Sequence, residues 1–317
     1  MKVRTDHPTP VSATVGAVSD RPFGFTSADG VRVACARWDG RGQLRGVIQI
    51  AHGMGEHIGR YAGVIEVLTS SGLTVYGNDH RGHGRTASSF TQFGEFGEGG
   101  FDLLVEDMFQ LSRIAKQENR GKPFLLLGHS MGSFAAQLYV LDHSREIDGL
   151  ILSGSGALDR LAHQASSAPV GSNILNASFE PARTPFDWLS RDSAVVDAFI
   201  NDPLCFAELQ PAALASFFEA AARLSDPLRL RDIRDDLPVY LFSGTEDPVG
   251  QQLEGVQLLI SRYQKAGLYD IFHEFYPGGR HEMLNEINRD EVLADLRGWI
   301  NAVLGRQRGW PKDPSVA

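Results

Sequence analysis

Residues 123–143 read PFLLLGHSMGSFAAQLYVLDH: an apolar run, a serine flanked by glycines, and an amphipathic run. The first run predicts a strand, the last predicts a helix, and residues 128–132 match the G-x-S-x-G pattern of a tight strand-to-helix turn. A serine on such a turn has a strained backbone, and side chains two positions before and after it would collide with their surroundings. The stretch therefore predicts a nucleophilic Ser130, the alternative being an ordinary glycine turn.

Strands and helices alternate on both sides of this turn. Further strands are predicted at 31–38, 46–51, 73–76, 149–152, 238–242 and 270–276. Helical spacing of apolar residues is found in 60–72, 101–118, 250–266 and a last helix from about 282 to 304, which turns Ile287, Leu293, Leu296 and Ile300 inward. Such alternation predicts an α/β fold with a mostly parallel sheet covered by helices on both faces.

The segment 156–231 interrupts this alternation. It opens with small residues, contains helical pieces such as 212–223, and is divided by prolines. A segment of this length is too long for a structureless loop, so we predict a helical cap over the end of the sheet. The predicted organisation is an N-terminal tail (1–20), an α/β core (21–155 and 232–306), the cap (156–231) and a C-terminal tail (307–317).

A serine nucleophile needs a base, and the base needs an orienting acid. Downstream of Ser130, one predicted strand ends in SGTEDP (243–248) and the next ends in PGGRH (277–281). Both lie just past carboxyl ends of strands, where ligands bind in open α/β sheets. We predict Asp247 as the acid and His281 as the base, with Glu246 as the competing acid. His273, inside a strand, is interpreted as structural.

The negative charge that develops on a tetrahedral intermediate needs preplaced donors. One should be the backbone N–H of Met131, which follows the nucleophile. The second should come from the glycine-rich loop HGMGEH (52–57), and we predict the amide of Met54.

Three other patterns could indicate bound groups. Histidines 52, 57, 80 and 83 could form a metal cluster, but glycines and Arg81 crowd those positions and no carboxylate spacing fits. The loop GEFGEGG (94–100) holds two glutamates and no lysine, so it would repel a phosphate. HExxH is incomplete because Asn285 stands where its second histidine would be. We expect neither a metal nor an organic cofactor.

The composition of the chain limits which kinds of partner and cellular location are expected. The 317 residues include 30 Lys and Arg against 39 Asp and Glu, a net charge of −9, which argues against nucleic acid. Cys35 and Cys205 cannot form a disulfide framework and are interpreted as buried thiols. No signal-peptide pattern and no apolar run of membrane-spanning length are found, so a cytoplasmic protein is expected.

Together these motifs resemble the monoacylglycerol lipase and lysophospholipase group of α/β-hydrolases, also described as serine aminopeptidase-like. The resemblance is carried by HGMGEHIGRY (52–61), YGNDHRGHGRT (76–86), GHSMGS (128–133), SRDSAVVDAFINDPL (190–204), SGTEDPV (243–249) and GGRHEMLNE (278–286). It implies the α/β-hydrolase fold, with a mostly parallel eight-stranded sheet and a helical cap insertion. It also implies a triad of Ser130, Asp247 and His281, with Met54 and Met131 at the oxyanion hole. The group commonly has a small residue where Met54 stands, and the larger side chain is expected to narrow the acyl entrance.

The expected activity is hydrolysis of carboxylic esters with apolar acyl chains, as in monoacylglycerols or lysophospholipids. Other aliphatic esters, such as hydroxyalkanoate oligomers, remain an alternative, and a non-catalytic binding protein on the same fold is a weaker one. The expected partner is a small acyl ester, with transient contact of the cap with a lipid surface allowed and the oligomeric state open. Most of the aromatic side chains of the cap are expected to form its core, and some to line an acyl channel: Phe179, Phe186, Trp188, Phe199, Phe206, Phe217 and Phe218.

Overall fold

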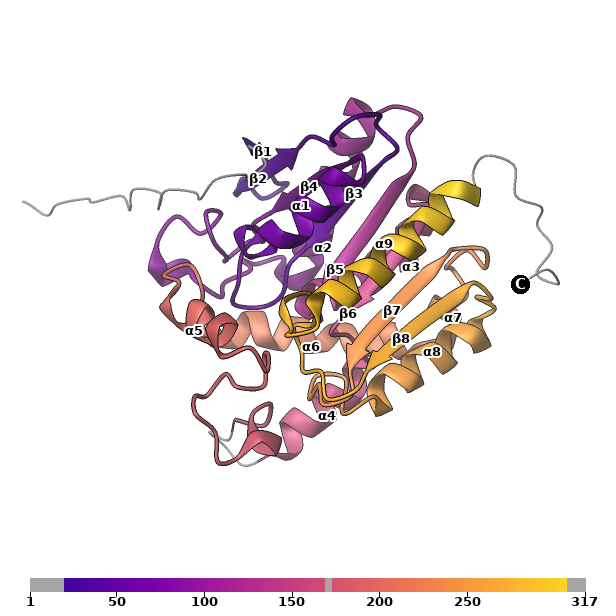
Figure 1. The fold of residues 1–317 in the computed structure, drawn as a ribbon. Coiled ribbons are helices and arrows are strands. Elements are labelled where there is room, and N and C mark those ends of the chain that lie inside the picture. Colours follow the sequence, from indigo (N-terminus) through magenta and orange to yellow (C-terminus); the bar gives the residue numbers. More distant parts are fainter. Residues whose placement is uncertain (1–19, 169–172, 307–317) are drawn as a thin grey trace, which may run out of the picture.

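A single eight-stranded sheet organises the described part of the chain (Figure 1). The computed structural model describes residues 20–168 and 173–306, so the two predicted tails lie almost entirely outside the described residues. The strands are β1 (Arg21–Thr26), β2 (Arg32–Trp38), β3 (Gly46–Ala51), β4 (Leu73–Asn78), β5 (Phe124–His129), β6 (Gly149–Ser153), β7 (Val239–Gly244) and β8 (Ile271–Tyr276). Their order is β1-β2-β4-β3-β5-β6-β7-β8.

The sheet is parallel from β4 to β8, whereas β1 pairs antiparallel with β2 and β2 pairs antiparallel with β4. Every residue of β3 to β7 is buried, as expected for strands covered on both faces. One face packs against α1 (Ala62–Ser70) and α9 (Arg289–Arg306). The other packs against α2 (Gly100–Glu118), α3 (Met131–His143) and α8 (Glu254–Ala266). This arrangement confirms the predicted fold class and brings the loops after β3, β5, β7 and β8 to one edge.

The described residues between β6 and β7 form helices and no strand. These helices are α4 (Leu158–Ser167), α5 (Ser193–Asn201), α6 (Pro211–Ser225) and α7 (Pro227–Leu230). We call this insertion, residues 156–231, the cap. Phe217 of α6 packs edge-on against Phe101 of α2 and Phe134 of α3, with ring centroids 5.1 and 5.7 Å apart. The α6 side of the cap therefore shares the main hydrophobic core, whereas Leu189, Val196 and Phe199 form a small separate cluster.

Two expectations differ from the structure. Strand β1 was not predicted, because Pro22 and Gly24 interrupt any alternation of apolar residues in RPFGFT. The last helix begins at Arg289 and not near Glu282, and Ile287 is 59% exposed instead of facing inward. The carboxylate of Glu286 accepts hydrogen bonds from the backbone N–H groups of Arg191, Arg280 and Ile287, which holds this segment outside the helix.

Candidate active site

Ser130 occupies a strained turn between β5 and α3. Its φ of 52° and ψ of −122° lie in a region that residues other than glycine rarely adopt. Its N–H donates to the carbonyl of Ser153 at 2.9 Å. A Cβ at Gly128 would lie 2.4 Å from the carbonyl oxygen of Gly132, and one at Gly132 would lie 2.2 Å from that of Ala51. Both contacts are far too close, so the predicted reason for the two glycines is confirmed.

Asp247 and His281 meet in the buried edge of the sheet. His281 Nδ1 lies 2.9 Å from Asp247 Oδ1, and the two residues are 1% and 0% exposed. The N–H of Val249 donates to the same carboxylate oxygen at 2.9 Å. Burial alone would lower the pKa of His281, but the Asp247 carboxylate outweighs it and raises that pKa above its ordinary value. Glu246 is exposed, so the geometry favours Asp247 as the acid.

Ser130 and His281 line one pocket together with Met54 and Met131. Among the described residues, no hydrogen bond joins the Ser130 hydroxyl to His281. Because Nδ1 of the imidazole is engaged by Asp247, Nε2 is the nitrogen left to act on a serine. The imidazole packs against the rings of Trp188 and His129, with centroids 4.9 and 4.7 Å away.

The two predicted oxyanion donors border this pocket. Met131 is the first residue of α3, so its N–H has no acceptor within the helix and lies at the positive end of the helix dipole. Met54 belongs to the loop 52–57, whose conformation is fixed from both sides. The N–H of Gly53 donates to Glu56 Oε1 at 2.6 Å, and the carbonyl of Gly55 accepts from the N–H of Phe206 in the cap at 2.9 Å.

The rest of the pocket is mostly apolar and comes largely from the cap. Six of the seven aromatic side chains predicted from the cap line it: Phe186, Trp188, Phe199, Phe206, Phe217 and Phe218. The same side chains also belong to hydrophobic clusters or pack against them, so the two expected roles, core and channel wall, coincide in these residues. Phe179 is the exception, since its ring packs beneath the guanidinium of Arg280 at 4.4 Å.

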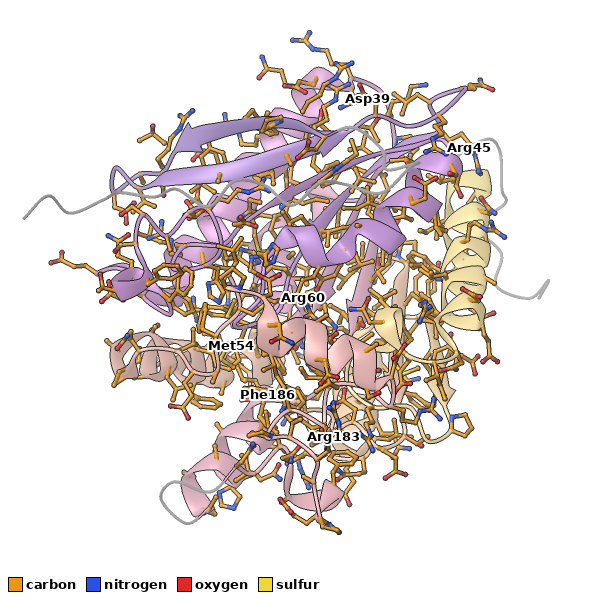
Figure 2. All side chains as sticks on the ribbon, turned by 60° about the vertical axis from the view of Figure 1, so that its left-hand side comes forward. Asp39, Arg45, Met54, Arg60, Arg183 and Phe186 are labelled. Atoms are coloured by element: carbon orange, nitrogen blue, oxygen red, sulfur yellow. The ribbon has the colours of Figure 1, made fainter. Side chains whose placement is uncertain are left out.

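The polar end of the pocket was missed in the sequence. Glu56, Arg60 and Glu282 line it and form a buried ion-pair network. Glu56 and Arg60 stand four residues apart, a spacing that could have indicated their pairing. Figure 2 shows Met54, Arg60 and Phe186 where the N-terminal part of the core meets the cap.

The histidines considered as a metal cluster separate into two groups. His52, His80 and His83 pack against one another in the interior with tilted rings. Burial lowers the pKa of His52 to about 4, that of His83 to about 3 and that of His80 well below its ordinary value, so the rings are neutral at pH 7.

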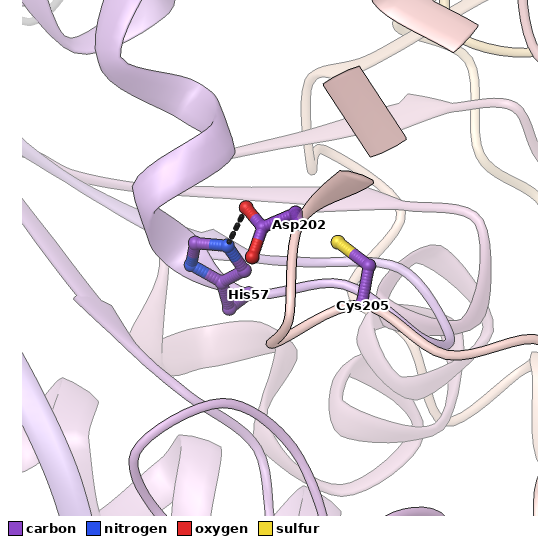
Figure 3. A group of neighbouring side chains, drawn as sticks. All are labelled: His57, Asp202 and Cys205. Atoms are coloured by element: carbon purple, nitrogen blue, oxygen red, sulfur yellow. Dashed lines mark hydrogen bonds and ion pairs between the residues drawn. The ribbon is translucent and has the colours of Figure 1, made fainter. Parts of the chain in front are cut away.

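His57 instead points toward Asp202 and Cys205 of the cap, where one ligand atom from each residue lies within 4.8 Å of the others (Figure 3). The N–H of Gly59 donates to His57 Nδ1 at 3.2 Å, which leaves Nε2 to donate to Asp202 at 2.9 Å. The contact between these two residues is a hydrogen bond that joins the loop 52–57 to the cap.

Comparisons with known proteins identify related hydrolases. A family model described as "Serine aminopeptidase, S33" (Hydrolase_4) matches residues 42–288. The monoacylglycerol lipase of Mycolicibacterium smegmatis is 31% identical over 278 residues, covering 87% of this chain and 95% of that protein. The monoglyceride lipase of Mus musculus is 27% identical over 285 residues, covering 87% and 89%. A thermostable carboxyl esterase from Bacillus coagulans, solved in complex with glycerol, superposes with a TM-score of 0.81 at 28% identity, covering 90% of this chain and 99% of that one.

Proposed function

The chain belongs to the hydrolase family described as serine aminopeptidase, S33, and is a carboxylic ester hydrolase; from this premise we propose that it cleaves esters of apolar acyl chains through an acyl-enzyme on Ser130. The substrates we propose are single-chain lipids of the monoacylglycerol or lysophospholipid type. The observation that carries the proposal is the buried Asp247–His281 contact beside a strained serine, opening on a mostly apolar pocket.

In the proposed mechanism, His281 Nε2 takes the proton of the Ser130 hydroxyl as its oxygen attacks the ester carbonyl. Asp247 holds the imidazole through Nδ1 and stabilises its charged form. The amides of Met54 and Met131 stabilise the oxyanion, and one such donor typically lowers the barrier by about 2.7–4 kcal/mol. His281 then protonates the leaving alcohol. Water, activated by the same imidazole, cleaves the acyl-enzyme and restores the serine.

The lining of the pocket supports an apolar acyl group. Apolar side chains from the core and the cap make up most of its wall, while Glu56, Arg60 and Glu282 stand at its polar end. Burying one CH₂ group of a substrate in such surroundings contributes about 0.8 kcal/mol. The pocket therefore favours a chain of several carbons over acetate.

Two measurements test the proposal. A fluorophosphonate probe should label the wild type and leave Ser130→Ala unlabelled, because only an activated serine attacks phosphorus. A series of p-nitrophenyl esters and monoacylglycerols should then give rising kcat/KM with acyl length. Equal labelling of both proteins would remove Ser130 from the mechanism. Turnover of aminoacyl amides without turnover of any ester would replace the proposed substrate class.

A further inference from the structure

The loop that carries Met54 is anchored by the buried carboxylate of Glu56. Glu56 Oε1 accepts hydrogen bonds from the N–H of Gly53 at 2.6 Å and from the hydroxyl of Tyr61 at 2.7 Å. A Cβ at Gly53 would lie only 3.1 Å from Cβ of Ser130, so this turn packs directly against the serine. A shift of the Glu56 side chain would therefore move the amide expected to stabilise the oxyanion.

Arg60 joins that loop to the loop of the proposed base. Its Nη1 lies 2.7 Å from Glu56 Oε2 and 2.7 Å from Glu282 Oε1, and its Nη2 lies 2.9 Å from Glu282 Oε2. Glu282 follows His281 directly in the chain, and its N–H donates to the carbonyl of Leu189 in the cap at 2.7 Å. The guanidinium also stacks on the ring of Phe199 of α5 at 5.0 Å. One side chain thus contacts the oxyanion loop, the histidine loop and the cap.

The side chains of this network are largely buried, so its ion pairs hold a defined geometry. The side chains of Arg60, Glu56 and Glu282 are 10%, 4% and 4% exposed. Burial would raise the pKa of Glu56, but Arg60 together with His129 and His52 outweighs this and lowers it to about 2. Both carboxylates are thus held by one guanidinium, whose planar fork fixes two oxygens of Glu282 at once. Removing that cation would leave two buried carboxylates facing each other.

We propose that Arg60 is a positioning residue for the reaction at Ser130, fixing the Met54 loop and the His281 loop relative to each other through Glu56 and Glu282. The inference rests on the proposed function, because those loops supply the proposed oxyanion donor and base. Arg60 acts through other groups and takes no part in bond making.

The test compares Arg60→Met, Arg60→Lys, Glu282→Gln and the double variant Arg60→Met/Glu282→Gln. For a p-nitrophenyl ester, Arg60→Met should lower kcat by about 10- to 100-fold with KM changed far less, as expected when reacting groups are misplaced. Arg60→Lys should retain more activity than Arg60→Met, since it keeps the charge and loses the fork. The double variant should exceed Arg60→Met in kcat, because one buried carboxylate has been removed. Arg41→Met is the matched control, because it breaks an ion pair with Glu66 whose side chains are 50% and 41% exposed.

The outcomes separate this inference from the proposed function. If Arg60→Met and Glu282→Gln keep kcat within twofold of the wild type while Ser130→Ala is inactive, the positioning role is wrong and the proposed function stands. A kcat loss in the double variant equal to that in Arg60→Met, with no gain for Arg60→Lys, would also overturn it. If Arg60→Met does not fold, Arg60→Lys and Glu282→Gln decide the question. Equal fluorophosphonate labelling of the wild type and Ser130→Ala would refute the proposed function itself.

Discussion

Two regions enclose the pocket and are built differently. One is the carboxyl edge of the sheet, formed by the loops after β3, β5, β7 and β8, and the other is the cap. At the edge, Ser130 sits on a strained backbone, and Asp247 and His281 are almost fully buried and joined at 2.9 Å. The cap contributes apolar side chains, and its only separate cluster among the described residues consists of Leu189, Val196 and Phe199. The contrast teaches that chemistry needs fixed polar geometry, whereas chain selection needs only apolar area of suitable shape. We therefore expect substitutions at the edge to abolish turnover and those in the cap to change selectivity.

The largest effect is expected for Asp247, the proposed acid at the carboxyl edge of the sheet. Asp247→Asn should lower kcat on the order of 10⁴-fold, because the amide no longer stabilises the imidazolium and favours the wrong ring tautomer. Glu246→Gln is the matched control, since this exposed neighbour should leave kcat unchanged. Steady-state kinetics on one short ester measure both. A large loss for Glu246→Gln with a small one for Asp247→Asn would reverse the assignment of the acid.

The pH dependence should reveal the raised pKa of His281. A base must be neutral to accept a proton, so activity is lost as the pH falls through its pKa. An imidazole with the ordinary pKa of about 6.5 is about one quarter neutral at pH 6, and His281 should be less so because Asp247, Glu282 and Glu56 raise its pKa. At pH 6, kcat/KM should therefore lie more than about fourfold below its plateau. An acid limb centred below pH 6.5 would contradict this reading.

Which residues of the site could be predicted from the sequence depends on how far apart in the chain the interacting residues stand. The turn at Ser130 is local, so its glycines and flanking apolar runs are sufficient to identify it. Asp247 and His281 are separated by 34 residues, but each follows a predicted strand, and parallel strands bring such positions to the same edge. The pairing of Arg60 with Glu282 spans 222 residues and has no such guide. Only the folded chain brings these two side chains together.

The roles of the side chains in the cap were less predictable, because its apolar residues face both the hydrophobic core and the pocket. Phe217 packs against the core and also borders the pocket, so its helical spacing alone cannot separate the two roles. A related ambiguity explains why Ile287 was wrongly expected to face inward. Its apolar character fits a helix face, but a hydrogen bond to Glu286 keeps it outside α9. Hydrophobic periodicity predicts that a side chain is buried, and tertiary contacts decide whether it is buried and against which neighbours.

A smaller effect is expected for the apolar wall of the cap. Phe218→Ala removes one side of the pocket, so kcat/KM for a twelve-carbon ester should fall about three- to fivefold relative to a four-carbon ester. This corresponds to losing contact with one CH₂ group at about 0.8 kcal/mol. Phe179→Ala is the matched control, because this phenylalanine of the cap stacks on Arg280 and does not line the pocket. An unchanged ratio in Phe218→Ala would mean that the acyl chain occupies another part of the pocket.

The smallest effect should arise where the two regions are joined by the His57–Asp202 hydrogen bond. Asp202 also accepts from the N–H of Leu204 at 2.9 Å, much as Asp226 accepts from the N–H of Leu228 at 2.8 Å. Replacing either aspartate by alanine removes a local turn contact, but only Asp202→Ala also breaks the link to His57. Its free energy of unfolding should therefore fall by about 1 kcal/mol more than that of Asp226→Ala, the net contribution of one such hydrogen bond. Thermal unfolding should show this as a Tm about 2 °C lower, with kcat within threefold of the wild type. Equal Tm values for the two variants would mean that the His57–Asp202 hydrogen bond contributes no net stability to the fold.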